Sequence, residues 1–207
     1  VLDEFSLVNL RNSSDFWGNK FGYQLGYKIF NPLNIERLTL QAEYNFVKPY
    51  TYAHHNPQQN YGHYNQPLAH PLGANFSEFL CLASYKINRI AFDAKILFVK
   101  FGGDFKNDTL SYGSNIYFST GNYAEEEGLV GMSSGRPSDF GIEMYQGNLT
   151  TINHSSFNIS YIINPQTNLK INLGLTLRDS KNEYGNTKTQ FVNFGIITDL
   201  FNHYYDI

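Results

Sequence analysis

Alternation of apolar and polar residues constrains this chain more than any other feature of its sequence. From Phe21 to Ile29, aromatic and aliphatic residues occupy every second position, with Gly, Gln or Lys between them. The segment from Leu38 to Phe46 repeats the pattern. Successive side chains of a strand point to opposite faces, so each segment predicts a strand with one apolar and one polar face.

The same pattern recurs along the chain and predicts eight antiparallel strands in all. Beyond the first two, strands are expected at residues 2–8, 78–86, 90–98, 157–163, 169–177 and 192–200. Short connections lie near Asn31, Asn88 and Asn164, and long ones near Ser14, Tyr61, Glu126 and Tyr184. In outer-membrane barrels the periplasmic turns are short and the extracellular loops long, so the alternation predicts which end faces outward.

Composition favours a membrane barrel over a soluble domain. Charged residues make up 16% of the chain, and aromatic residues another 16%, whereas about a quarter of a soluble domain is charged. No apolar run approaches the ~20 residues of a transmembrane helix. We therefore expect an all-β fold, an antiparallel transmembrane β-barrel of the bacterial outer membrane in contact with membrane lipid.

The size of the loops bears on the size of the barrel. One domain, residues 1–207, would carry two long extracellular loops, near 48–75 and 102–153. An eight-stranded barrel is filled by its own side chains and cannot admit such loops. Val1 is not an initiator, and no export signal follows it. We therefore expect this chain to be the C-terminal portion of a larger barrel, with further strands outside it.

The first long connection carries the candidate binding residues. They are polar or aromatic and close in sequence: Tyr61, His63, Tyr64, Asn65, Gln66 and His70. Tyrosine rings can stack on the apolar faces of sugars, while Asn, Gln and His hydrogen-bond to sugar hydroxyls. The same residues suit a plug that constricts the lumen. Glycan contact and a lumen plug are both open interpretations of this segment.

Four histidines fall between residues 54 and 70, but their spacing matches no standard metal motif. The single Cys81 excludes an internal disulfide and a cysteine-ligated zinc site. We expect no metal and no cofactor. The net charge of −3, without a basic cluster, argues against a nucleic-acid partner.

A second polar cluster, Arg136, Asp139 and Glu143, lies in the second long connection. A barrel hydrolase would need a histidine and carboxylates at hydrogen-bond distance, and residue types alone do not supply that geometry. No catalytic residue is therefore predicted. Inward charges such as Glu43 and Asp93 are expected to pair across the lumen, since unpaired buried charge is costly. Trp17 is expected in an interfacial aromatic girdle.

Several segments resemble one family of large barrels. They are residues 17–26, 43–45, 49–52, 60–75 and 202–206. These segments are similar to the capsule-assembly, Wzi-like outer-membrane proteins, and most of all to the RemB group of gliding-motility proteins. The resemblance implies the C-terminal part of a large barrel, with surface polysaccharide or proteins of the motility and secretion machinery as partners. It carries over no catalytic residue.

The sequence thus predicts a noncatalytic outer-membrane barrel that engages surface polysaccharide, or a motility or secretion partner, through its extracellular loops. Two alternatives stay open. A barrel enzyme, a lipid or glycan hydrolase, requires a histidine and a carboxylate within hydrogen-bond distance in a cleft at the rim. A soluble lectin-like β-sandwich requires the apolar faces to meet in a core.

Overall fold

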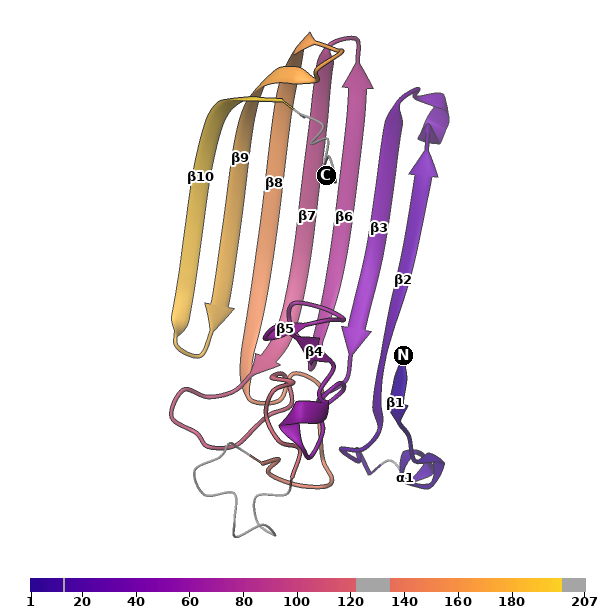
Figure 1. Cartoon of the computed structure of the whole chain (residues 1–207), viewed down its shortest axis with the longest axis vertical. Coiled ribbons are helices and arrows are strands. Elements are labelled where there is room, and N and C mark those ends of the chain that lie inside the picture. The colour runs from indigo at the N-terminus through magenta and orange to yellow at the C-terminus, as the bar shows by residue number, and fades with distance from the viewer. Residues whose placement is uncertain (13, 122–134, 199–207) are drawn as a thin grey trace, which may run out of the picture.

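One antiparallel sheet dominates the molecule. The computed structural model describes residues 1–12, 14–121 and 135–198. Within these residues eight strands form a sheet in the order β1-β2-β3-β6-β7-β8-β9-β10, and β4 and β5 form a separate hairpin (Figure 1). Neighbours in the large sheet are neighbours in chain order, so it is a meander. The all-β, antiparallel prediction is confirmed at this level.

The large sheet is built from long strands joined mostly by short turns. Its strands are β1 (Leu2–Glu4), β2 (Lys20–Phe30), β3 (Leu38–Val47), β6 (Phe76–Ile87), β7 (Ile90–Gly103), β8 (Asn148–Asn164), β9 (Leu169–Asn182) and β10 (Gly185–Ile197). The smaller elements are α1 (Leu7–Arg11), η1 (Pro32–Asn34), η2 (Pro57–Gln59), β4 (Gly62–His63) and β5 (Gln66–Pro67). No helix in the described residues is long and apolar enough to cross a membrane.

Strand register gathers the apolar residues on one face of the sheet. Leu25 lies opposite Tyr44, Tyr44 opposite Phe79, and Phe79 opposite Phe98. A second row runs through Phe92, Ile159, Leu173 and Phe194. Directly paired residues of an antiparallel ladder share a face. We call this continuous surface the apolar face.

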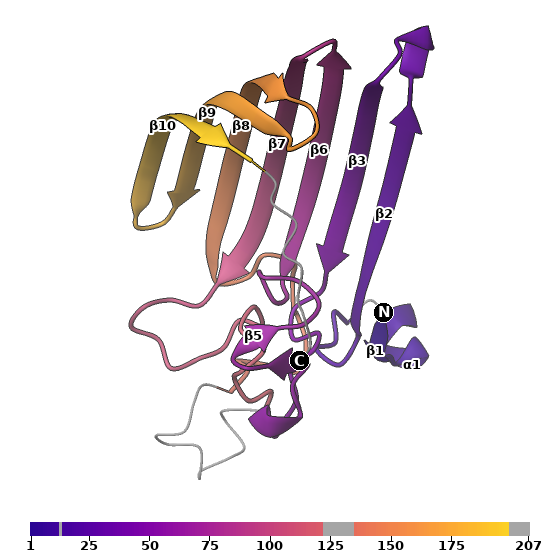
Figure 2. The same ribbon diagram turned by 45° about the horizontal axis from the view of Figure 1, so that its top comes forward.

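The apolar face is exposed along its length. Leu25 is 67% exposed, Leu173 47% and Phe194 74%. In the described chain, no second layer covers these residues, and the small hairpin β4–β5 lies on the other side of the sheet (Figure 2). Contiguous apolar surface beyond a few hundred Å² is rare on soluble monomers and marks a membrane or interaction surface.

The opposite surface, the polar face, carries the predicted inward residues. Glu43 accepts hydrogen bonds from the amides of Gln24 and Gln41, and Asp93 accepts one from Ser84 (2.8 Å). Neutral neighbours on the same strand or an adjacent one therefore hold these two carboxylates in the described chain, where opposite charges across the lumen were expected. Short polar side chains can reach neighbouring residues of the sheet, so the two carboxylates obtain hydrogen-bond partners without an ion pair across the lumen.

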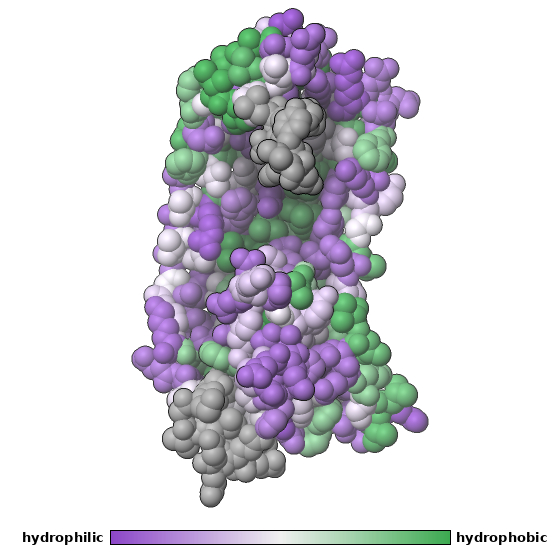
Figure 3. All heavy atoms as spheres, viewed as in Figure 1, coloured by the Kyte–Doolittle hydropathy of each residue, from purple (hydrophilic) through white to green (hydrophobic). Residues whose placement is uncertain are grey.

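The loops pack on the polar face at one end of the sheet. We call the described residues of the two long connections, 48–75, 104–121 and 135–147, the loop layer. At this end the polar face carries Val47, Phe76 and Phe101, which meet Tyr52 and Ile116 of the loop layer. Hydrophilic residues cover the outside of the loop layer (Figure 3). This contact forms the principal buried apolar cluster of the described residues.

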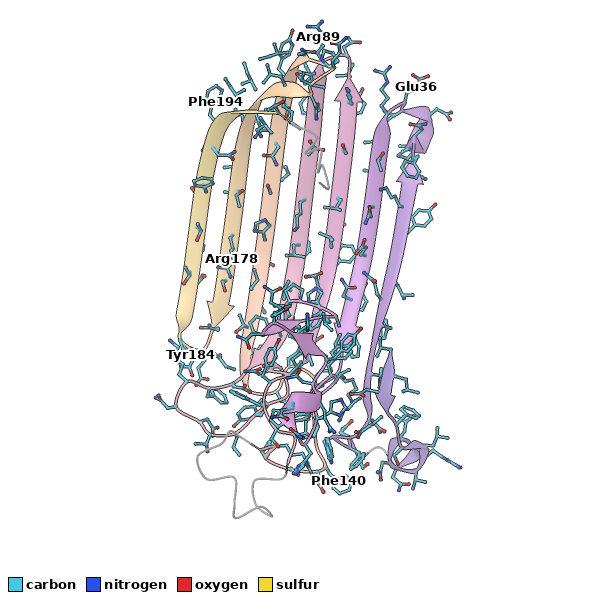
Figure 4. All side chains as sticks on the ribbon, in the orientation of Figure 1. Glu36, Arg89, Phe140, Arg178, Tyr184 and Phe194 are labelled. Atoms are coloured by element: carbon cyan, nitrogen blue, oxygen red, sulfur yellow. The ribbon has the colours of Figure 1, made fainter. Side chains whose placement is uncertain are left out.

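The described strands form an open, curved sheet, with β1 and β10 at its edges (Figure 2). The β2–β3, β6–β7 and β8–β9 turns gather at the end marked by Glu36 and Arg89, while Phe140 and the β9–β10 turn at Tyr184 lie at the loop end (Figure 4). A closed barrel is not formed by these strands alone.

Three sequence-based boundaries are corrected. Only Leu2–Glu4 of the expected strand 2–8 is extended, because Ser6 caps helix α1 through its hydroxyl. The expected polar loop around Tyr184 is a tight hairpin, since residues 179–182 pair with residues 185–188. Residues 148–153 belong to β8, so the second connection spans 104–147. The acidic residue Glu126 and the C-terminal residues 199–207 lie outside the described residues.

Candidate functional site

The six candidate binding residues separate into two groups. Four of them form the β4–β5 hairpin: His63, Tyr64, Asn65 and Gln66. Tyr64 and Asn65 have positive φ values of 48° and 59°, the backbone of a two-residue hairpin turn. Tyr64 is 89% exposed, and the His63 ring lies edge-on to it at 4.2 Å. The hairpin tip therefore projects into solvent.

The remaining two residues, Tyr61 and His70, line a pocket between the loop layer and the polar face. Its volume is about 380 Å³. The sheet contributes Gln24 and Asn45 to the lining, and the loop layer contributes Tyr52 beside Tyr61. The Tyr52 and Tyr61 rings lie 5.7 Å apart, tilted by 32°. The volume falls in the ~300–1,000 Å³ range of small-molecule sites.

His70 ties the loop layer to the sheet. Its Nδ1 accepts a hydrogen bond from the backbone N–H of Leu72 (3.2 Å), so Nε2 carries the proton and donates to Glu78 Oε1 (3.4 Å). The ring also stacks on Phe76, with centroids 4.4 Å apart. Both ring nitrogens are engaged in holding the loop, which leaves no free lone pair on His70 to act as a base.

Two carboxylates fix the orientation of the pocket amides. Asn45 Nδ2 donates to Glu78 Oε1 (3.0 Å), and Gln24 Nε2 donates to Glu43 Oε2 (3.2 Å). An ionised carboxylate only accepts hydrogen bonds, so the NH₂ group of each amide must face its carboxylate. The amide oxygens of Asn45 and Gln24 are consequently left as acceptors for a ligand.

The Tyr52 side chain is buried but retains an uncommitted hydroxyl. Tyr52 is 8% exposed, and its phenolic oxygen makes no hydrogen bond with another described residue. Burial, and then the nearby Asp3 and Tyr61, raise the pKa of Tyr52 above its usual value. The hydroxyl therefore stays protonated at neutral pH and can donate to a ligand in the pocket.

Buried hydrogen bonds hold the loop layer in one arrangement. Asn75, fully buried, donates through Nδ2 to the carbonyls of Gly102, Tyr112 and Gln146 at 3.0–3.1 Å, and accepts from the Tyr145 N–H at 2.6 Å. One side chain thus joins the sheet to three points of the second connection.

Tyr50 adds a second tie within the loop layer. Its hydroxyl donates to the Ser111 carbonyl (2.8 Å) and accepts from Gln146 Nε2 (3.1 Å). Burial raises the pKa of the Tyr50 phenol well above its usual value, and the Gln146 hydrogen bond lowers it to a smaller extent. A protonated, doubly bonded phenol at the centre of the loop layer favours a fixed structure.

The second polar cluster is only partly assembled. Arg136 pairs with Asp139 (2.7 Å) and donates to the Thr120 carbonyl, whereas Glu143 is exposed. The Arg136 guanidinium also lies 4.0 Å from the Trp17 ring centroid, and Tyr50 meets the same ring edge-on. Trp17 therefore packs against the loop layer, where cation–π contact stabilises it, and the aromatic-girdle interpretation of this residue stays a prediction.

The arrangement has little of what hydrolysis or metal binding requires. In the described residues no three His, Cys, Asp or Glu side chains converge as metal ligands. One histidine, His70, does lie beside a carboxylate, but both are used to hold the loop. No described Ser, Thr or Cys lines the pocket, so a serine, threonine or cysteine nucleophile is lacking there.

Sequence reasoning did not select Gln24, Asn45 and Tyr52 as site residues. Gln24 and Asn45 occupy inward positions of alternating strands near the long connection, and this position was the available signal. Tyr52 gave no such signal, because its burial depends on how the loop folds back.

Comparison of the chain with protein-family models, curated proteins and solved structures gives no match.

Proposed function

We propose that this chain forms part of a noncatalytic outer-membrane β-barrel, and that its loop layer lies at the extracellular mouth and engages surface polysaccharide. The observation that carries the proposal is the continuous apolar face, which crosses the sheet from β2 to β10, while polar residues predominate on the opposite face. Lipid outside and water inside is the environment that such a sheet fits.

The soluble-sandwich alternative requires a partner for the apolar face. In the described chain the loops pack on the polar face, so the exposed residues of the apolar face have no core to join. A lipid bilayer would remove them from water without a second sheet. This placement of the loops supports the barrel over the sandwich.

Polysaccharide fits the site better than a motility or secretion protein. A specific protein interface buries about 800 Å² on each partner, whereas the assembled feature here is a concave pocket of about 380 Å³ lined by tyrosines and amides. Ring stacking combined with amide hydrogen bonds suits sugars. The hydrolase alternative is weakened because His70 and Glu78 are bonded to the loop and to each other.

Cysteine labelling in intact cells tests both the membrane location and the orientation. Tyr64→Cys places a thiol at the exposed hairpin tip, and Glu36→Cys places one at the short-turn end (Figure 4). A membrane-impermeant maleimide should label Tyr64→Cys on intact cells, but Glu36→Cys only after the outer membrane is opened. The native Cys81 lies on the apolar face between Ala42 and Ile96 and should stay unlabelled in both states.

The labelling pattern can refute the proposal in two ways. Labelling of Glu36→Cys on intact cells would reverse the orientation. Recovery of the protein in the soluble fraction, with Cys81 freely labelled, would remove the membrane assignment altogether.

A further inference from the structure

The pocket between the loop layer and β2–β3 has the properties of a ligand site that is already formed. Its walls come from two separate parts of the fold, the sheet through Gln24 and Asn45 and the loop layer through Tyr52 and Tyr61. The loop wall is fixed by His70 on Glu78 and by Asn75 on three carbonyls. A ligand therefore meets little ordering cost on entry.

The pocket offers hydrogen-bond partners for hydroxyl groups. The amide oxygens of Gln24 and Asn45 accept, because Glu43 and Glu78 hold their NH₂ groups. The Tyr52 hydroxyl donates or accepts. Gly22 lines the same pocket, and a Cβ there would lie 3.4 Å from the Tyr52 oxygen and 3.0 Å from Val47 Cγ2. The missing side chain at this position thus leaves space beside the hydroxyl.

An aromatic surface stands next to these polar groups. The Tyr61 ring is about half exposed (52%) and packs against the buried Tyr52 ring. An aromatic ring with one face supported and the other open is a stacking platform for an apolar ring face. Hydroxyls around the edge of a pyranose, with C–H groups on its face, match this combination of groups.

The charges near the pocket discriminate between sugars. No described Lys or Arg side chain lines it. Val1 does line it, and its N-terminal ammonium donates to the Gly22 carbonyl (2.9 Å). Directly behind the two amides lie the carboxylates of Glu43 and Glu78. A negatively charged sugar would find no Lys or Arg side chain in the described lining, an N-terminal ammonium already bonded to the Gly22 carbonyl, and two nearby like charges.

We propose that this pocket binds a neutral sugar unit, stacked on Tyr61 and hydrogen-bonded by Gln24, Asn45 and Tyr52, and that it rejects uronic acids and other anionic sugars. The inference rests on the proposed function, since it specifies the site and the sugar class through which surface polysaccharide is engaged.

Titration of the detergent-solubilised protein with simple glycosides tests the inference. The probes are methyl glucoside, methyl galactoside and methyl mannoside, each compared with methyl glucuronide, by calorimetry and saturation-transfer NMR. We expect at least one neutral hexoside to bind with its ring protons closest to an aromatic side chain. The glucuronide should bind roughly tenfold more weakly, because of its charge near Glu43 and Glu78.

Matched substitutions identify the pocket. Tyr61→Ala should weaken hexoside binding roughly tenfold through loss of the stacking surface, whereas Tyr64→Ala, at the exposed hairpin tip, should leave it unchanged. Gln24→Leu should also weaken binding. Its control is Gln41→Leu, which removes another amide from the same Glu43 carboxylate but lines a different pocket. Trp17 fluorescence reports whether each variant keeps its loop layer folded.

The outcomes separate this inference from the proposed function. Equal binding of hexosides and glucuronide, equal losses in Tyr61→Ala and Tyr64→Ala, or no hexoside binding by folded protein would each overturn the sugar site. None of these results changes the cysteine-labelling pattern. Conversely, a soluble protein that binds hexosides through Tyr61 would keep the sugar site and remove the membrane barrel.

Discussion

At the scale of single residues, Asn75 determines how the loop layer is attached to the sheet. It has a positive φ of 58°, a conformation that Asn tolerates better than most residues, and this backbone turns the chain from the loop into β6. The Gly102 backbone is so close that a Cβ there would lie 2.5 Å from Asn75 Nδ2. The Gln146 carbonyl oxygen would lie closer still to that Cβ, so Gly at 102 is required by the close approach of residues 145–146 together with the Asn75 side chain.

Asn75→Ala should destabilise the loop layer by at least ~2 kcal/mol, since buried carbonyls and an N–H would lose their partner. The measurement is a denaturant titration followed by fluorescence of Trp17, the single tryptophan, which contacts Arg136 and Tyr50. Asn65→Ala is the control: Asn65 has a similar φ of 59° but is exposed at the hairpin tip. Equal shifts in the two variants would contradict the role given to the Asn75 hydrogen bonds.

At the scale of elements, each long strand separates two environments by its alternation. In β9, Leu173 lies in the middle of the apolar residues on the apolar face, where it is paired with Ile159 and Phe194. Thr176 belongs to the polar face and lies opposite Ser156. Residues three positions apart on one strand are therefore expected to tolerate charge very differently.

Leu173→Lys should impair insertion into lipid vesicles by roughly 2–4 kcal/mol, the cost of a cation on the lipid face near the bilayer midplane. Thr176→Lys should insert normally because its charge enters the polar side. Heat-modifiable migration in gel electrophoresis measures the folded fraction of each variant. Similar insertion of both variants would show that the apolar face does not contact lipid.

At the scale of the whole molecule, the open edges of the sheet need partners. Strand β10 has no neighbour on its outer side among the described strands. Strand β2 pairs with β1 only over a short stretch, and the rest of its outer side also lacks a described neighbour. In a bilayer each unpaired N–H or C=O costs several kcal/mol, and only closed barrels avoid this cost. Further strands must therefore complete the wall if the membrane assignment holds.

Intact mass spectrometry of the protein isolated from its native membrane should give a mass well above the 23.7 kDa of these residues, because the completing strands are expected on the same chain. Native mass spectrometry of the detergent-solubilised assembly provides the comparison. A monomer at 23.7 kDa would instead require β2 to pair with β10, and it would refute the larger barrel.

Much of the fold follows from local physics and could be predicted. The two-residue period of a strand assigns every residue from Phe21 to Ile29 to a face without knowledge of its neighbours. Within the described residues the sheet has the eight strands expected, in chain order. Local interactions that the alternation pattern does not show produced the errors. Ser6 caps a helix within an expected strand. The polar residues around Tyr184 pair as a hairpin, although their polarity had indicated a loop.

The candidate site depends on tertiary structure to a greater degree. Composition selected Tyr61 and His70, but it could not separate them from Tyr64. Tyr64 is close to them in sequence, yet it lies at the exposed hairpin tip and does not line the pocket. The sequence by itself determined the two faces of the sheet, because alternation is a property of the backbone. Only the folding of residues 48–75 onto the polar face decided which side chains share a pocket, because burial of Phe76 and Val47 requires contacts between residues far apart in the chain.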